Sequence, residues 1–224
     1  LESFWDAWSD RSISDFYNKV GSYVGNNFYE KYQEDIKLLK SLRLDSFGTS
    51  IQWTRLMDRN QKLNPEGAAF YHNVCACARD NDIELFMNLY HFDMPAYLYD
   101  RGGWENREVV EAYAVYARTA FREFGKEIRY WFTFNEPIVE PDQEYRLGNW
   151  YPFLKDERRG LQVQYHIALA HSLAVREFRI AKEEGYLLDD AQIGLINAFA
   201  PPYTKENPTA QDLEALRMTD GIHN

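Results

Sequence analysis

The stretch Ile128-Arg-Tyr-Trp-Phe-Thr-Phe-Asn-Glu-Pro137 decides the fold. Residues 128–134 predict a buried strand, because apolar and aromatic side chains dominate them. The strand ends abruptly at Asn135 and Glu136, and Pro137 then prevents further ladder pairing. The segment therefore places an amide and a carboxyl at the carboxyl end of a buried strand.

Strands and helices alternate on both sides of this stretch. Further strands are predicted at residues 45–53, 83–90 and 192–198. Helices are predicted over residues 29–42, from Asn64 onward, from Asn106 to a stop at Gly125, and over residues 161–184. Four strands separated by helices predict a parallel sheet with right-handed crossovers.

Polar side chains at the strand ends distinguish a barrel from an open sheet. An open dinucleotide-binding sheet carries Gly-x-Gly-x-x-Gly after an early strand, and the sequence has no such motif. Barrels instead collect catalytic groups at the carboxyl ends of successive strands. We therefore predict a (β/α)8 TIM barrel, of which this chain covers four strands. The strand-end residues are Arg55, His91, Asn135, Glu136 and Asn197.

Composition excludes several classes of protein. The chain has 224 residues, 45% of them hydrophobic, and a net charge of -10 from 25 Lys+Arg against 35 Asp+Glu. It can bury a core, and its acidity argues against nucleic acid or an anionic membrane as a partner. No apolar run reaches the roughly 18 residues that span a bilayer, and residues 1–10 lack the basic start of a signal peptide.

The two cysteines point to a reduced compartment. Cys75 and Cys77 are too close in sequence for an easy disulfide, and a zinc site needs more Cys or a paired His. We expect them to be small apolar residues of a cytoplasmic protein.

Glu136 is the candidate catalytic group. A carboxyl that follows Trp131 and two phenylalanines lies beside apolar surface, which suits a general acid near neutral pH. An isolated glutamate in this position is otherwise a surface acid that caps a loop. The surrounding motifs decide between these two interpretations.

Four blocks resemble glycoside hydrolase family one, the β-glucosidase and 6-phospho-β-glycosidase family. They occur in the family's order, cover nearly the whole chain and together are highly specific. The resemblance implies that the chain covers about strands two to five of the barrel. The blocks are Tyr32-Gln-Glu-Asp-Ile36, Ser50-Ile-Gln-Trp-Thr-Arg55, Leu89-Tyr-His-Phe-Asp-Met-Pro95 with Gly102-Gly-Trp104 after it, and Thr133-Phe-Asn-Glu-Pro137.

The resemblance implies a role for each strand-end residue. Glu136 is the general acid that protonates the leaving oxygen and then the base that activates water. Asn135 hydrogen-bonds the sugar 2-hydroxyl, and His91 bonds another ring hydroxyl. Arg55 stabilises the ionised nucleophile, Asn197 lines the site, and Trp131 shapes the pocket around the carboxylates. Two carboxyl groups supply the acid, the base and the nucleophile, so no metal or organic cofactor is expected.

Some of these residues have a structural alternative. His91 can be a satisfied core histidine, Arg55 can be a salt-bridge partner, and the motif around Asn197 is loose. His166 and His171 are five residues apart, which does not place them on one helix face as metal ligands. We interpret both as ordinary helix residues.

Two family blocks do not occur in the sequence. The nucleophile of the family lies in a Thr-Glu-Asn-Gly block on strand seven, and a Gln-x-Glu-Gly segment belongs to strand one. Glu206-Asn207 continues to Pro208 and does not match. We therefore expect residues 1–224 to be one partial catalytic domain, without the first strand and the C-terminal half, and inactive as an isolated polypeptide.

The resemblance also bears on the substrate. Residues 135–139, Tyr145, residues 150–152 and residues 162–166 look more like the bacterial 6-phospho-β-glycosidases. The family's phosphate-binding residues come from the loop after strand eight, which is not in this sequence. A β-glucosidase for unphosphorylated sugars is the first alternative. A non-catalytic sugar-binding or interaction protein is the second, favoured by the aromatic richness and the missing nucleophile.

Overall fold

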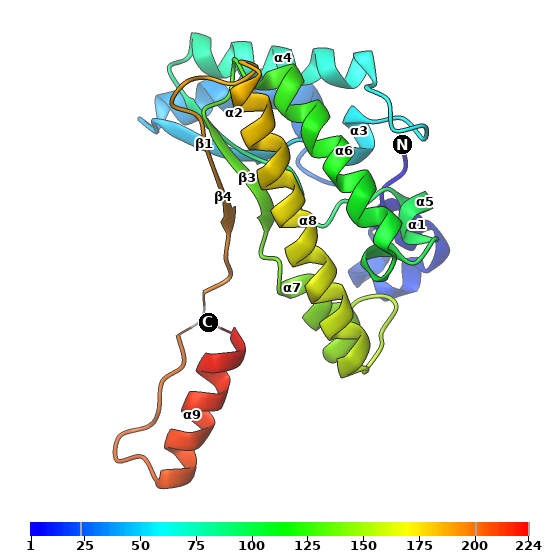
Figure 1. Ribbon diagram of the computed structural model, residues 1–224, viewed down its shortest axis with the longest axis vertical. Coiled ribbons are helices and arrows are strands. Elements are labelled where there is room, and N and C mark those ends of the chain that lie inside the picture. The colour runs from blue at the N-terminus through cyan, green and yellow to red at the C-terminus, as the bar shows by residue number, and fades with distance from the viewer. Residues whose placement is uncertain (23, 200, 224) are drawn as a thin grey trace.

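The computed structural model of the chain describes residues 1–22, 24–199 and 201–223. Its centre is a parallel sheet of four strands in the order β1-β2-β3-β4 (Figure 1). The predicted alternation and the parallel pairing are confirmed. The strands are β1 Ser46–Ser50, β2 Glu84–Asn88, β3 Tyr130–Asn135 and β4 Gln192–Ile196.

The first strand is shorter than the predicted 45–53. It ends at Ser50, and Trp53–Leu56 forms the short helix α3. The reason is a pair of contacts from distant residues. The Gln52 N–H donates to the Tyr71 hydroxyl at 2.7 Å, and the Trp53 N–H donates to the Asp93 carboxylate at 3.0 Å. These side chains replace the ladder partners that a longer strand would need.

Three of the four long helices begin at side-chain caps. Asn64 accepts the Glu66 N–H, Asn106 accepts the Glu108 N–H, and Asp156 accepts the Arg159 N–H, as N-cap residues do. The long helices are α2 Phe28–Ser41, α4 Pro65–Asp80, α6 Arg107–Phe124 and α8 Glu157–Glu183. Shorter helical segments include α1 Phe4–Arg11, α5 Ala96–Tyr99, the 3-10 turn η3 Gly103–Glu105, α7 Val139–Pro141 and the π-helical turn η4 Asp142–Arg146.

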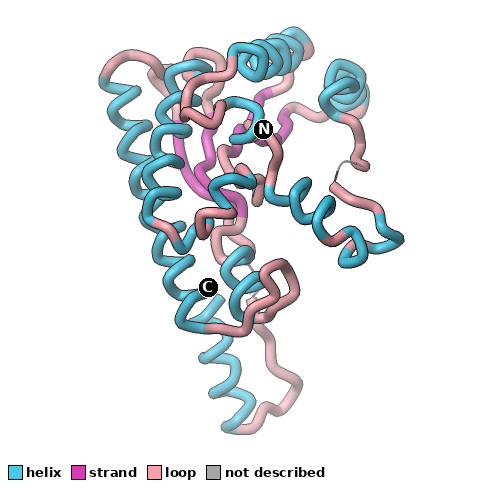
Figure 2. The backbone as a smooth tube through the Cα atoms, turned by 90° about the vertical axis from the view of Figure 1, so that its right-hand side faces the viewer, coloured by secondary structure: helices cyan, strands magenta, loops and turns pink. Residues whose placement is uncertain are grey.

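The core lies between the sheet and its helices. Helices α6 and α8 run side by side along the sheet (Figures 1 and 2). Alternate side chains of the strands point toward them, so Met87 and Trp131 are fully buried. On the other face of the sheet Phe86 stacks on Tyr130, with ring centroids 4.6 Å apart. That second aromatic layer is half-buried.

Helix α9 Ala210–His223 lies apart from this sheet and its helices in Figure 1. In the described ranges, no helix is both long and apolar enough to cross a membrane.

Candidate active site

The carboxyl ends of the four parallel strands lie on the same side of the sheet. Hydrogen bonds between neighbouring segments continue past the last ladder residues. The Asn135 N–H donates to the Tyr90 carbonyl at 2.9 Å, and the Glu136 N–H donates to the Ile196 carbonyl at 2.7 Å. Parallel strands in register bring their carboxyl ends to the same side of a sheet. The segments that carry His91, Asn135 and Glu136 are therefore neighbours.

Glu136 has an uncommon backbone conformation. Its φ of 47° lies in the left-handed region, where a residue other than glycine costs on the order of 1–3 kcal/mol. Two hydrogen bonds hold it there: its N–H donates to Ile196, and its carbonyl accepts the Val139 N–H at 2.9 Å. The chain turns sharply at this point, and the Glu136 side chain is half-buried at the end of β3.

His91 lies beside Glu136 at the end of the neighbouring strand. Its side chain is exposed, yet partial desolvation lowers its pKa, and the negative charge of Glu136 opposes that change. The two groups are thus close enough to interact electrostatically. The interpretation of His91 as a satisfied core histidine does not agree with this exposed position.

Asp93 lies in the Leu89–Pro95 block and is a site residue beyond those predicted from the strand ends. Its buried carboxylate accepts the His91 N–H at 3.2 Å and the Trp53 N–H at 3.0 Å. It therefore connects the segment that carries His91 to the helix that carries Arg55. The signal available in the sequence was an acid between Phe92 and Met94, both apolar.

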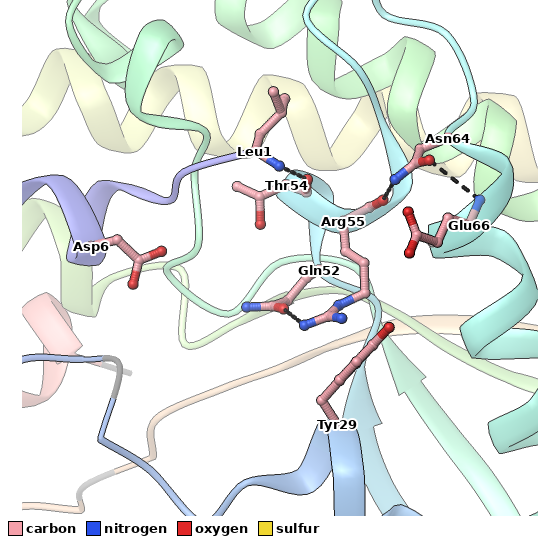
Figure 3. Close-up of a pocket in the computed structure, with 9 residues that line it drawn as sticks. Leu1, Asp6, Tyr29, Gln52, Thr54, Arg55, Asn64 and Glu66 are labelled. Atoms are coloured by element: carbon pink, nitrogen blue, oxygen red, sulfur yellow. Dashed lines mark hydrogen bonds between the residues drawn. The ribbon is translucent and has the colours of Figure 1, made fainter.

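Arg55 extends from α3 toward a pocket of about 450 Å³ (Figure 3). Its guanidinium lies over the Tyr29 ring, 4.2 Å from the centroid, and donates to Gln52 Oε1 at 3.3 Å. Its Nε is buried without a hydrogen-bond partner in the described part of the chain. No carboxylate of residues 1–22, 24–199 or 201–223 forms an ion pair with it, so the salt-bridge alternative finds no partner there.

Trp131 does not shape this edge, contrary to the expectation from the resemblance. Its indole is 1% exposed, donates from Nε1 to the Ile128 carbonyl at 3.1 Å and packs edge-on against Phe121 of α6. The strand alternation points its side chain toward the helices. It belongs to the core that supports β3.

Asn197 follows β4 and is exposed. It lines a separate pocket of about 340 Å³ together with Pro137 and His171. Its backbone lies beside the Glu136 segment, because Ile196 accepts the Glu136 N–H. Its pocket is bordered by α8 and includes Pro137 but not Arg55, so Asn197 lies near the Glu136 segment and outside the pocket that Arg55 lines.

The two helix histidines have protein partners. His166 Nδ1 lies 2.6 Å from the Trp104 carbonyl, and His171 Nδ1 lies 2.8 Å from the Thr133 hydroxyl. Over the ranges that the structure describes, no group of three His, Cys, Asp or Glu side chains is arranged to hold a metal ion.

The buried Asp93 makes stability depend on pH. Burial raises its pKa from 3.8 to about 6, although its backbone hydrogen bonds oppose the rise. Because the folded state binds more protons than the unfolded state between about pH 4 and 6, Asp93 contributes less stability as pH rises through that window. The change is about 3 kcal/mol at roughly 1.4 kcal/mol per pKa unit. The Asp93→Asn variant should lack this pH-dependent change in the free energy of unfolding. Urea unfolding of the wild type and the variant at pH 4 and pH 7 measures the difference. Parallel pH profiles would contradict this assignment.

The comparisons with known proteins place the chain in a family. The family model described as Glycosyl hydrolase family 1 matches residues 1–224, so the chain belongs to this family, whose members hydrolyse O-glycosyl bonds. The parallel sheet and its helices are accordingly part of a (β/α)8 barrel.

Particular relatives are similar over half of their own length. The 6-phospho-beta-glucosidase GmuD of Bacillus subtilis is 39% identical over 100% of this chain and 47% of that protein. Beta-glucosidase A of Acetivibrio thermocellus is 33% identical over 97% of this chain and 47% of its own. The 6-phospho-beta-galactosidase of Streptococcus mutans is 35% identical over 97% and 45%. The chain thus spans about half the length of the curated relatives it matches.

Solved structures of β-glucosidases are also similar to the whole of this chain. The psychrophilic beta-glucosidase BglU of Micrococcus antarcticus superposes with a TM-score of 0.89 at 32% identity, over 100% of this chain and 46% of that one. The family 1 b-glucosidase of Thermotoga maritima superposes with a TM-score of 0.86 at 28% identity, over 100% and 48%.

Proposed function

We propose that the protein to which these residues belong is a retaining β-glycoside hydrolase, with Glu136 as its general acid and base. The observation that carries the proposal is the placement of Glu136 in a held left-handed turn at the end of β3, beside His91. Glu136 gives its proton to the leaving glycosidic oxygen as the anomeric C–O bond breaks. It later takes a proton from the water that releases the sugar.

Asn135 and His91 bind hydroxyl groups of the sugar in this proposal, and Arg55 faces the nucleophile. A retaining enzyme needs a second carboxylate about 5–5.5 Å from the first. The buried Nε of Arg55, which has no hydrogen-bond partner among the described residues, supports its role as the cation that keeps such a carboxylate ionised. Two carboxyl groups complete this chemistry, so the proposed reaction requires no metal or organic cofactor.

The substrate is a 6-phosphorylated β-glucoside in this proposal. Its support is the 39% identity with the Bacillus subtilis 6-phospho-beta-glucosidase, against 33% with beta-glucosidase A. The resemblance of residues 135–139, Tyr145, residues 150–152 and residues 162–166 to the phospho-glycosidases points the same way. The same proposal places the protein in the bacterial cytoplasm, where phosphorylated sugars are retained. The two free cysteines agree with that location.

A direct comparison of substrates tests this choice. The full-length enzyme should cleave cellobiose-6-phosphate with a higher kcat/KM than cellobiose. The same assay on Glu136→Gln shows whether turnover comes from this site. Faster cleavage of unphosphorylated cellobiose would favour the plain β-glucosidase, which the similarity to the Thermotoga maritima and Micrococcus antarcticus enzymes supports. Binding of both sugars without cleavage would favour the non-catalytic sugar-binding protein.

A further inference from the structure

Tyr90, the residue before His91, contacts the acid/base segment twice. Its carbonyl accepts the Asn135 N–H at 2.9 Å. Its hydroxyl lies 2.9 Å from both carboxylate oxygens of Glu140 and donates to that group. The Trp104 Nε1–H donates to the same hydroxyl oxygen at 3.2 Å, so both capacities of the phenol are used. Tyr90 is 1% exposed and Glu140 is 3% exposed.

These two contacts bracket Glu136. Asn135 precedes it directly, and Glu140 lies one helical turn beyond it on α7. Between them the chain passes through the left-handed conformation at Glu136. A strained backbone persists only where the surrounding structure over-determines it. The main-chain bonds to Ile196 and Val139 fix the turn itself, and the Tyr90 contacts fix its two flanks.

We propose that Tyr90 and Glu140 form a clamp that sets the orientation of the Glu136 carboxyl at the end of β3. Both are positioning residues, since their side chains are buried and hydrogen-bond to each other. The inference rests on the proposed function for its catalytic consequence. The clamp itself rests on the hydrogen bonds alone.

Glu140 is surrounded by acids and phenols, and it forms no ion pair with any residue that the structure describes. Asp93, from the segment after β2, and Glu144, from η4, add negative charge. Glu144 is 2% exposed and accepts the hydroxyl of Tyr99, from α5, at 3.2 Å. Glu105, from η3, is paired with Arg159 of α8, at 2.8 Å.

Burial raises the pKa of Glu140 to about 8, although hydrogen bonds from Tyr90 and Trp104 oppose the rise. A neutral acid at this position is mimicked well by glutamine, which keeps an acceptor oxygen for Tyr90. Glu140→Gln is therefore the conservative variant, and Glu140→Ala removes the acceptor altogether.

The test uses full-length enzyme and aryl glycosides whose leaving groups span a range of acidity. Tyr90→Phe and Glu140→Ala should lower kcat for the poorest leaving group by about 10- to 100-fold, because misplacing a catalytic group by about 1 Å costs up to about 10²-fold. KM should change less than kcat, and activated leaving groups should lose less. Glu140→Gln should keep most of the wild-type rate that Glu140→Ala loses.

Tyr116→Phe is the matched control. This variant also removes hydrogen bonds of a fully buried phenol, here to the Ile51 carbonyl at 2.7 Å and the Leu89 carbonyl at 2.8 Å. The Tyr116 hydroxyl forms neither of these bonds with residues 135–140. It should leave the dependence on the leaving group as in the wild type. A wild-type leaving-group dependence in Tyr90→Phe would overturn the clamp.

Amide hydrogen exchange of the peptide that covers residues 135–140 separates the two proposals. Exchange should be faster in Tyr90→Phe and Glu140→Ala than in Tyr116→Phe, whether or not the enzyme cleaves the glycosides supplied. Faster exchange in a protein that hydrolyses no glycoside sustains the clamp and overturns the proposed function. Unchanged exchange in an active enzyme overturns the clamp and leaves the proposed function intact.

Discussion

Glu136→Gln in the full-length enzyme should slow the hydrolysis of glycosides with poor leaving groups by about 10²- to 10⁴-fold, the usual contribution of a positioned general acid. An alkyl or sugar leaving group is a strong base, so its oxygen must be protonated as the C–O bond breaks, and glutamine has no acidic proton to give. Activated nitrophenyl glycosides should lose far less in the first step, because their phenolates depart unaided. The measurement is kcat/KM across a series of leaving groups.

Glu183→Gln provides the control for that series. Glu183 is an exposed carboxyl at the end of α8, so the same exchange of atoms there should leave every rate unchanged. An equal loss for good and poor leaving groups in Glu136→Gln would argue against the acid role. It would instead indicate a general distortion of the site.

Gly67→Ala should destabilise the protein by about 2–3 kcal/mol, in the range of an overpacked core. Gly67 lies in the first turn of α4, where α3 crosses it. A Cβ at this position would lie 2.0 Å from the Arg55 carbonyl oxygen and 2.8 Å from the carbonyl carbon. Both are backbone atoms of the helix that presents Arg55, so relief requires α3 to move. We therefore expect a loss of turnover together with the loss of stability, measured by urea unfolding and aryl glycoside assays.

Gly160→Ala is the comparison for Gly67→Ala, because it also replaces a glycine in the first turn of a long helix. Its added Cβ would lie 3.2 Å from the Arg146 Cγ and 3.4 Å from the Tyr145 Cβ, both side-chain atoms that need to shift by only a few tenths of an ångström. Alanine is favoured over glycine within a helix by about 1 kcal/mol. We expect unchanged or slightly raised stability there. Equal effects at the two positions would show that α3 does not press on α4.

Local sequence was sufficient for the existence and order of the four strands and the long helices, but not for the short helix α3 that carries Arg55. Apolar runs bounded by Asn caps and glycines predict the four strands and their helices, and the order of strand, helix and strand predicts parallel pairing. Because parallel strands all end on one side, that order also brings His91, Asn135 and Glu136 to one edge. Each of these inferences depends on contacts that are near in sequence or repeat with a fixed period.

The direction of individual side chains depended on the tertiary structure. Trp131 belongs to the strand whose carboxyl end carries the site, yet the pleat points it into the helix layer. A register shift between Phe132 and Asn135 also interrupts the simple alternation there. One inserted residue changes the face of the sheet on which the following side chains lie. The strand pattern therefore cannot specify which way the side chains of the last residues of β3 point.

The sequence by itself determined the barrel, the family and the position of the Glu136 carboxyl directly after β3. Only the tertiary structure decided which distant groups support the segments around that carboxyl. Asp93 meets the Trp53 backbone across 40 positions, and Tyr90 meets Glu140 across 50. Nothing in the polar stretch from Glu140 to Glu144 predicts burial, because the phenols and the indole that bury it come from other segments. Local patterns record periodicity and chain breaks, whereas the partners of a buried polar group become known only when distant segments are brought into contact.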